Sequence, residues 1–349
     1  MSYKNGNMKT IELHENGLDI QFRIRENGVV ELADLSSQEV KKAAMEPKED
    51  IYYPVVEIHR SGTGSLNMHA YKNNINQSSV DFVYEKHELK EQDGGKELEI
   101  VMVSPEKLKA VYHMRLFDGV PAVQTWTEIT NEGSEDQGLT YVSSFIYQGI
   151  SRGGDKPYYK KTDIYVPFNS WCCEAQWQKY DAETLNLNGM VVDGFNHQGY
   201  GLNRYCYSGK GTWSTCEYLP MGIAEDRETG ETYIFQVESS GQWLIEYGSA
   251  QGGNLYLTVS GATEQEHGWY KNLKPGECFT TVPAGAAVVK GGLNPAVAAL
   301  TRYRRKVRRA NPDDEKLNVV FNDYMNCLMG DPTTERELSI IDKAAELGC

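Results

Sequence analysis

The sequence predicts a mainly β fold, in which two large antiparallel sheets pack face to face and are followed by a helix and one β/α unit. Three observations predict it. From residue 10 to about 290, short segments alternate apolar and polar residues, with turn residues every eight to twelve positions or so. Helical periodicity is nearly absent from that stretch. After Gly291-Gly292 the character changes to strong helix formers, and then to a strand, a loop and a helix.

The strands are read from alternation, because successive side chains of a strand point to opposite faces. Apolar residues alternate with polar ones in 231–238, and turn residues separate this segment from 242–247 and then from 255–259. Segments 98–102 and 123–129 follow the same pattern. So many strands exceed one small sandwich. We therefore expect two large sheets, with Trp and Tyr between them and along their edges.

A helix is expected over 296–309. Asn294-Pro295 suits a helix start, apolar residues follow at spacings of three and four, and Asn311-Pro312 is expected to end it. Six of the eight residues from Arg302 to Arg309 are basic. A nucleic-acid patch would explain them, but only Tyr303 could stack on a base, so a solvated helix face docking on acidic surface is the favoured interpretation.

The last segment predicts a β/α unit. Residues 317–321 form a short apolar run typical of a strand buried on both faces. Thr334 and Glu337 match a capping box, Leu338, Ile341 and Ala345 form the expected buried stripe, and Gly348 suits the helix end. One such unit cannot close a barrel, so we expect a longer protein. The expected domains are 1–292, a linker helix 293–312, and an incomplete barrel 313–349.

Charge and composition exclude several classes of function. The net charge of -14 disfavours nucleic acid as a partner and suits a neutral ligand. No apolar stretch approaches the roughly 20 residues of a membrane span, and the first residues do not form a signal peptide, so a cytoplasmic protein is expected. The seven cysteines show no CxxC spacing; buried thiols are favoured over a reactive Cys172-Cys173 pair, and no metal site is assigned. No cofactor is expected, because no glycine-rich phosphate motif opens a helix.

Several segments together resemble glycoside hydrolase family 36, the α-galactosidase or melibiase family. The most specific ones are 319–335 and 341–349, which resemble the opening of that family's catalytic barrel. Similar segments occur upstream in the order that the family shows, so that the resemblance covers nearly the whole chain; they are 171–177, 211–220, 228–235, 240–243 and 273–279.

The resemblance implies an N-terminal β-supersandwich, a linker helix and the start of a (β/α)8 barrel that hydrolyses terminal α-galactosides with retention. The family's two catalytic carboxylates come from later barrel strands, in motifs that this sequence lacks, so no catalytic residue is expected here and the chain alone should be inactive. An α-N-acetylgalactosaminidase on the same scaffold is an alternative. A non-catalytic carbohydrate-binding or oligomerisation module is another, and a homo-oligomer is expected in either case.

The candidate substrate contacts are Asn322, Asp323 and Tyr324, at the carboxyl end of the expected strand, where barrel active sites assemble. Where the family commonly has Ser-Trp after the Asn, this sequence has Asp323 and Tyr324. The tyrosine ring could pack on a sugar and the carboxylate could accept hydroxyl hydrogen bonds, which leaves the preferred sugar open. A loop-capping carboxylate and a simply packed tyrosine are equally compatible with the sequence.

Other candidates in the β-domain are weaker. Trp171, Trp177 and Trp213 could form a glycan-stacking platform, although core or interface packing is the favoured interpretation. The seven histidines show no paired spacing, and the two that flank the 62–65 loop, His59 and His69, are expected to be exposed.

Overall fold

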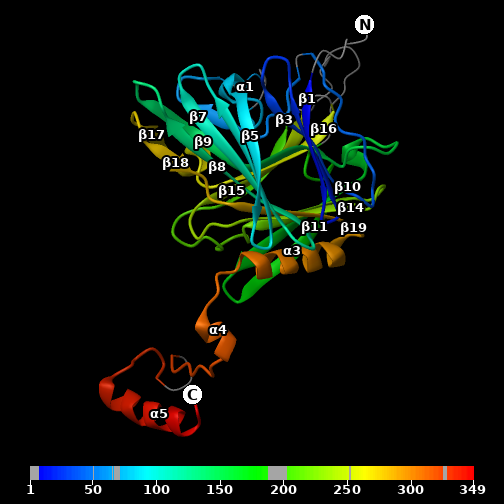
Figure 1. Ribbon diagram of the computed structural model, residues 1–349. Helices are drawn as coiled ribbons and strands as arrows, with labels where there is room; N and C mark the ends of the chain where they lie inside the picture. The colour runs from blue at the N-terminus through cyan, green and yellow to red at the C-terminus, as the bar shows by residue number, and fades with distance from the viewer. Residues whose placement is uncertain are drawn as a thin grey trace. The chain divides into compact units, whose positions relative to one another are not determined.

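The computed structural model describes residues 8–49, 51–64, 66, 71–187, 203–250, 253–324 and 328–349. The chain divides into two compact units, Met1–Lys306 and Val307–Cys349 (Figure 1). The division falls within the segment that the sequence predicts as the linker helix. None of the described helices is long and apolar enough to cross a bilayer.

A ten-stranded antiparallel sheet dominates the first unit. Its strand order is β11-β10-β13-β14-β19-β8-β7-β6-β5, and β18 also pairs with β8. The two ends of this order, β5 and β11, are edge strands with exposed side chains. The bounds of its strands are β5 Val83–Gln92, β6 Gly95–Val103, β7 Leu108–Phe117, β8 Val120–Asn131, β10 Thr162–Ser170, β11 Cys173–Asp181, β13 Met221–Asp226, β14 Glu231–Val237, β18 Cys278–Thr280 and β19 Ala284–Lys290.

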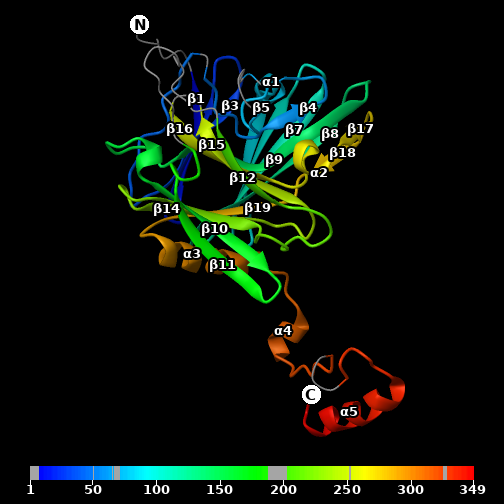
Figure 2. The same cartoon turned by 180° about the vertical axis from the view of Figure 1, so that it is seen from behind.

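The opposing layer is a six-stranded antiparallel sheet of order β12-β15-β16-β9-β17, with β4 also paired with β9 (Figure 2). Its strands are β4 Ile58–Arg60, β9 Gln137–Ile150, β12 Arg204–Gly209, β15 Trp243–Ala250, β16 Asn254–Ser260 and β17 Lys271–Leu273. A separate three-stranded sheet is formed by β1 Lys9–Glu15, β2 Leu18–Ile24 and β3 Val30–Ser37. The predicted class, mainly β with large antiparallel sheets, is confirmed.

The core lies between the sheets and follows the predicted alternation. Leu98, Ile100 and Met102 of β6 are buried and belong to the same apolar cluster as Leu257 and Val259 of β16. Tyrosines fill much of the space, as expected. Trp243 is fully buried there as well, and its indole Nε1 donates to the Ser214 carbonyl at 2.8 Å.

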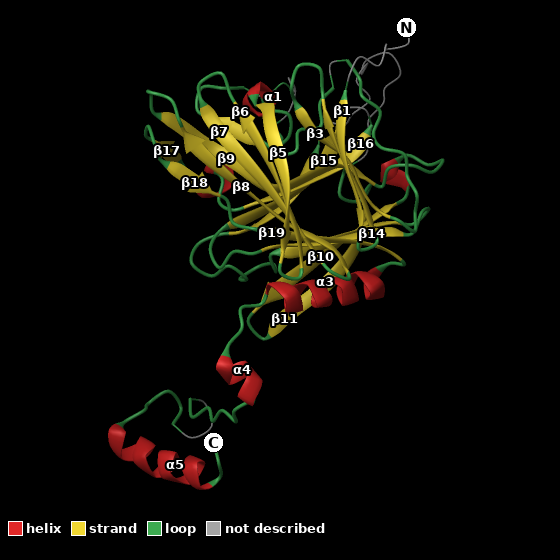
Figure 3. Ribbon diagram, viewed as in Figure 1, coloured by secondary structure: helices red, strands yellow, loops and turns green. Residues whose placement is uncertain are grey.

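Helix α3, Leu293–Val307, follows the last long strand, close to its predicted position (Figure 3). Tyr303 is fully buried. A Cβ atom at Gly285 of β19 would lie 2.5 Å from its ring, so that glycine lets the helix approach the sheet closely. Arg304 donates to Gln236 of β14 at 2.6 Å. The helix ends before Asn311-Pro312, which instead begins α4, Pro312–Lys316, with Asn311 as its N-cap.

The described part of the first unit also contains three short helical segments: α1 Gln77–Asp81, the 3-10 turn η1 Tyr158–Lys160 and α2 Glu264–His267.

The expected strand at 317–321 is not formed. Leu317 adopts the left-handed conformation as the C-cap of α4, and residues 318–323 have no regular secondary structure. Val319 and Val320 are 67% and 85% exposed. A strand buried on both faces needs neighbours for its backbone hydrogen bonds and its side chains. The described part of the second unit contains no strand at all, so these partners are missing there.

Helix α5, Thr334–Glu346, forms close to its predicted position, with two differences. Its N-cap is Thr333, whose hydroxyl accepts from the Arg336 amide, so the expected capping box at Thr334 is shifted by one residue. None of its residues is buried, which contradicts the expected buried stripe; Leu338 and Ile341 are each 57% exposed because the described part of this unit has no layer to cover them.

The end of α5 agrees with the sequence. Gly348 has a φ of 83° and follows the C-cap Leu347. The amides of Gly348 and Cys349 donate to the carbonyls of Ala345 and Ala344 at 3.1 and 3.0 Å, which is the Schellman arrangement.

Candidate functional site

The three predicted contact residues lie together in a turn of the second unit, but not at the end of a strand. The side-chain oxygen of Asn322 accepts from the Tyr324 amide at 3.0 Å, which closes a local turn. Asn322 and Tyr324 are exposed, and Asp323 is half-buried. The sequence therefore identified a local cluster of polar side chains, whereas the strand that was expected to present it is absent.

Tyr324 is held against the backbone of Gly330. The Gly330 amide donates to the Tyr324 carbonyl at 2.9 Å. A Cβ atom at Gly330 would lie 3.2 Å from the tyrosine ring, and the φ of Gly330 is 75°, so a side chain would be both crowded and strained there. The ring nevertheless stays 61% exposed. It thus offers an apolar surface of the kind that packs on a sugar ring.

Asp323 has a partner that the sequence analysis did not identify, Glu337 of α5. A hydrogen bond between the two carboxyl groups raises the pKa of Glu337 above its ordinary value, because the proton that they share favours the neutral acid. The sequence placed Glu337 in a capping box, where it would bond the helix N-terminus. Since the cap is Thr333, Glu337 is one position too far along, and its side chain reaches Asp323 instead.

This carboxyl pair can bind hydroxyl groups, and the hydrogen bond within it differs from the arrangement of a glycosidase pair. Retaining glycosidases hold their two carboxyl groups about 5 Å apart, so that one attacks the sugar while the other protonates the leaving oxygen. Asp323 and Glu337 are hydrogen-bonded to each other, and Glu337 is in contact with solvent. The largest cause of the raised pKa of Glu337 is the hydrogen bond to Asp323, whereas a catalytic acid in an apolar pocket has its pKa raised mainly by desolvation.

The exposed tryptophans of the first unit contradict packing in the core, whereas packing at an interface stays a prediction. Trp171, in the turn between β10 and β11, is 79% exposed, and Trp213 is 53% exposed. Trp177 of β11 is half-buried. Cys172 and Cys173 are also exposed, so the expectation of buried thiols there is wrong. Trp171, Cys172, Cys173 and Trp177 share one cause, because the β10–β11 hairpin lies at the edge of the ten-stranded sheet; Trp213 lies in the segment between β12 and β13.

A cavity of about 510 Å³ opens in the first unit. Lys42, Tyr53, Arg152 and Asn254 are among the residues that line it. Arg152 pairs with Asp34, and Lys42 pairs with Glu231. Burial raises the pKa of Asp34, which the Arg152 guanidinium partly opposes. Paired charges and a tyrosine around a hollow of this size suit a ligand with several hydroxyl groups.

None of the five histidines that the structure describes forms a site with the predicted residues. His59 is in β4 and only 7% exposed, so the expectation that it lies in a solvent-exposed loop is wrong. His69 and His197 fall outside the described residues. His113 of β7 is buried beside Glu97 and Glu99 of β6, a group that strand alternation could have revealed only once the register was known.

The fold is similar to that of solved α-galactosidases. A variant of the GH36 α-galactosidase AgaA from Geobacillus stearothermophilus, in complex with stachyose, superposes with a TM-score of 0.70 at 16% identity, covering 97% of this chain and 49% of that one. AgaB from the same organism gives 0.72 at 15% identity, covering 100% and 49%. The α-galactosidase from Lactobacillus brevis gives 0.67 at 15% identity, covering 97% and 47%.

No protein-family model and no curated protein matches the sequence. The chain spans about half the length of the solved α-galactosidases that it matches. The resemblance to glycoside hydrolase family 36 is therefore confirmed at the level of the fold: this chain is built like about half of such an enzyme.

Proposed function

We propose that this chain is the N-terminal portion of a retaining α-galactosidase-type glycoside hydrolase that acts on terminal α-linked galactosides. The observation that carries the proposal is the superposition with α-galactosidases over 97 to 100% of the chain, at TM-scores of 0.70 and 0.72. Stachyose is bound in one of those structures and raffinose in another, which supports an α-galactoside oligosaccharide as the substrate class. An α-N-acetylgalactosaminidase on the same scaffold is the close alternative.

In this proposal the catalytic carboxylates are supplied by sequence outside residues 1–349. The carboxyl pair at Asp323 and Glu337 is not assigned as a nucleophile and an acid, because the two groups interact with each other through a hydrogen bond. The expected role of Asn322, Asp323 and Tyr324 is contact with the sugar: the carboxylate accepts from hydroxyl groups and the ring packs on a pyranose face.

The proposal is tested by assaying two proteins side by side. The 349-residue chain should not release galactose from raffinose or from a chromogenic α-galactoside. The product of the complete open reading frame should do so, with the anomeric configuration retained. Turnover by the 349-residue chain would contradict the absence of a catalytic pair, and a complete product that is inactive on α-galactosides would contradict the substrate class. The same assay with α-N-acetylgalactosaminides tests the alternative: their hydrolysis in preference to α-galactosides would favour an α-N-acetylgalactosaminidase.

A second candidate, a non-catalytic carbohydrate-binding or oligomerisation module, is favoured by the cavity beside Arg152 and by the exposed Trp171 and Trp213. Calorimetry of the 349-residue chain with galactose, melibiose and stachyose tests sugar binding. Measurable binding that is lost in Arg152→Met or Trp171→Ala would favour the module. No heat with any of the three sugars would remove this candidate as a sugar-binding protein.

A further inference from the structure

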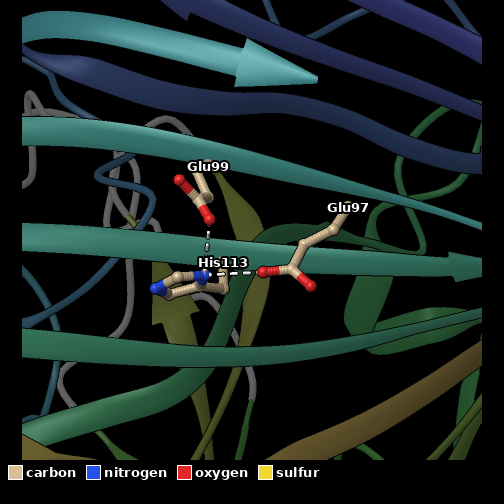
Figure 4. A group of neighbouring side chains, drawn as sticks. All are labelled: Glu97, Glu99 and His113. Atoms are coloured by element: carbon tan, nitrogen blue, oxygen red, sulfur yellow. Dashed lines mark hydrogen bonds and ion pairs between the residues drawn. The ribbon is translucent and has the colours of Figure 1, made fainter. Parts of the chain in front are cut away.

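A compact group of three ligating side chains lies on the outer face of the ten-stranded sheet, and none of the three is among the residues proposed to contact sugar. Leu98 and Ile100 of β6 point into the core, so Glu97 and Glu99 between them point to the other face. In the register of the sheet, Glu99 lies directly opposite His113 of β7. Figure 4 shows the two carboxylates directed at the same imidazole.

The distances within the group suit one small ion. The imidazole Nδ1 of His113 lies 2.9 Å from Glu97 Oε1 and 3.9 Å from Glu99 Oε1, and the three atoms all lie within 4.8 Å of one another. Zinc–nitrogen and zinc–oxygen bonds of about 2.0–2.2 Å in a tetrahedron place neighbouring ligand atoms roughly 3.4 Å apart. Movements of about an ångström in the carboxylates would therefore complete three corners.

Neighbouring side chains hold the ligands in orientation. The indole of Trp126 stacks on the imidazole at 4.6 Å and 6°, which fixes the plane of the ring. The Gln92 amide donates to the second oxygen of Glu97 at 2.6 Å, which leaves Oε1 facing His113. Outer contacts of this kind orient metal ligands in proteins.

The three ligating side chains differ in exposure, and the more exposed side of the group leaves the fourth coordination position open to water. The side chains of His113 and Glu97 are 9% and 10% exposed, whereas that of Glu99 is 23% exposed. Lys90, which is 38% exposed, bonds Glu99 Oε1 at 2.5 Å and is free to swing into solvent. Nε2 of His113 is buried and has no partner in the described part of the chain, so Nδ1 is the ring atom presented to the carboxylates.

We propose that Glu97, Glu99 and His113 bind a zinc ion through the two Oε1 atoms and Nδ1, with water as the fourth ligand. One imidazole and two carboxylates favour Zn²⁺ over Mg²⁺ and Ca²⁺, which prefer oxygen ligands alone in larger numbers. In the bound state the imidazole is neutral, with its single proton on Nε2 and a lone pair on Nδ1 for the ion, and Lys90 has moved off Glu99. The ion links β6 to β7, so it acts as a clamp between the two strands and takes no part in sugar hydrolysis.

Titration of the untagged 349-residue chain with Zn²⁺ tests this, after its cysteines have been alkylated to remove competing thiolates. The native chain should bind one equivalent, and its Tm should rise with the Zn²⁺ concentration, since the ion binds the folded chain. Co²⁺ should give the visible absorption of a tetrahedral site without a thiolate band. Mg²⁺ at the same concentration should have no effect on Tm.

His113→Gln should weaken Zn²⁺ binding by more than about 100-fold, because it removes a ligand and not merely an outer contact. The matched control is His87→Gln on β5, which should bind like the native chain: His87 lies opposite Ile100 and therefore on the other face of the sheet. Glu99→Gln is the second variant. Its side chain is the most exposed of the three, so the chain should fold and still lose affinity.

The near-ultraviolet circular dichroism of each variant reports whether it is folded. Failure of the alkylated native chain to bind Zn²⁺ would show that the group is only an ion pair between an imidazole and two carboxylates. Unchanged binding by folded Glu99→Gln or His113→Gln would place the ion elsewhere. Either result overturns the proposal, and neither depends on whether the longer protein is an α-galactosidase.

Discussion

Glu246 shows how single buried charges are accommodated inside the sandwich. It is fully buried in β15 and accepts hydrogen bonds from the backbone and side-chain amides of Asn73, both at 2.8 Å, from Arg204 at 2.6 Å and from the Tyr256 hydroxyl at 2.5 Å. Several charge-assisted bonds offset the cost of removing the carboxylate from water. A strand sequence alone could not reveal this, since the donors Asn73 and Arg204 lie 173 and 42 residues away from Glu246 in the sequence.

Lys72, which is attracted to Glu246 of this network, makes the free energy of unfolding depend on pH in the alkaline range. It is 1% exposed, and burial lowers its pKa from 10.5 to about 8, against the attraction of Glu246. Between these two values the unfolded chain binds a proton that the folded chain has released. The free energy of unfolding should therefore rise with pH from about 8 to 10, by on the order of 2 kcal/mol.

The measurement is urea denaturation at several pH values. Lys72→Met should flatten the rise, whereas Lys86→Met, at an exposed position on β5, should leave it unchanged. A native chain whose stability is flat between pH 8 and 10 would contradict the burial of a charged lysine. Above pH 10 the comparison is less direct, because the raised pKa values of buried tyrosines such as Tyr233 then lower the stability of the folded chain.

Tyr324 provides the residue-level test of the proposed sugar contact. If its ring packs on a pyranose, Tyr324→Ala in the complete protein should raise KM by roughly tenfold or more, in line with the 1–3 kcal/mol that aromatic stacking contributes on other planar ligands. Tyr324→Phe keeps the ring and should leave KM nearly unchanged. An unaltered KM in the alanine variant would show that the ring is only packed against Gly330.

At the scale of single elements, the start of α5 depends on one hydroxyl. Thr333 caps the helix, whereas Thr334 lies inside it. Thr333→Ala should destabilise the helix by about 1 kcal/mol, because it leaves an amide unpaired. Thr334→Ala is the matched control, and it should be neutral or slightly stabilising, because alanine is the better helix former. Hydrogen exchange of the α5 amides measures both; faster exchange in Thr334→Ala alone would mean that the cap lies at 334.

Elements whose residue pattern is local were predicted well from the sequence. Strands β6, β8, β14, β15 and β16 and helices α3 and α5 all form close to their expected positions, because alternation and helix spacing are properties of neighbouring residues. The prediction of a strand at residues 317–321 was wrong because it depended on more than the local pattern. Their composition suits a buried strand, yet a strand needs partners, and the described part of the second unit contains none.

The candidate site was only half predictable for the same reason. Asn322, Asp323 and Tyr324 are neighbours in the sequence, so their local cluster could be found from the sequence itself. The pairing of Asp323 with Glu337 depends on a cap that is displaced by one residue, and helix boundaries are seldom fixed that closely by sequence. The group around His113 depends on the register of two strands, which no single segment reveals.

At the scale of the whole molecule, the second unit exposes an unusual amount of apolar surface. Leu317, Val319 and Val320 are at least 67% exposed, and Leu338 and Ile341 of α5 are each 57% exposed. Apolar surface of this extent favours association. We expect the 349-residue chain to self-associate as its concentration rises, measured by light scattering.

A charge on the apolar face of α5 should weaken this association. Ile341→Asp places it there, whereas the control, Ser339→Asp, adds the same charge at a polar, exposed position of the helix. A chain that stays monomeric at high concentration would contradict the expectation, as would equal association of both variants.

The alternation of side chains in the ten-stranded sheet has one more consequence. Because odd and even positions of β6 and β7 serve opposite faces, the residues that hold the two layers together are not those that meet the surroundings. One face of the sheet is therefore constrained by packing in the core, and the other face is not. Substitutions at Glu97, Glu99 or His113 can therefore change which ligands the outer face binds while the packing of the core stays the same. An affinity for a ligand can be gained or lost there without a change in the fold.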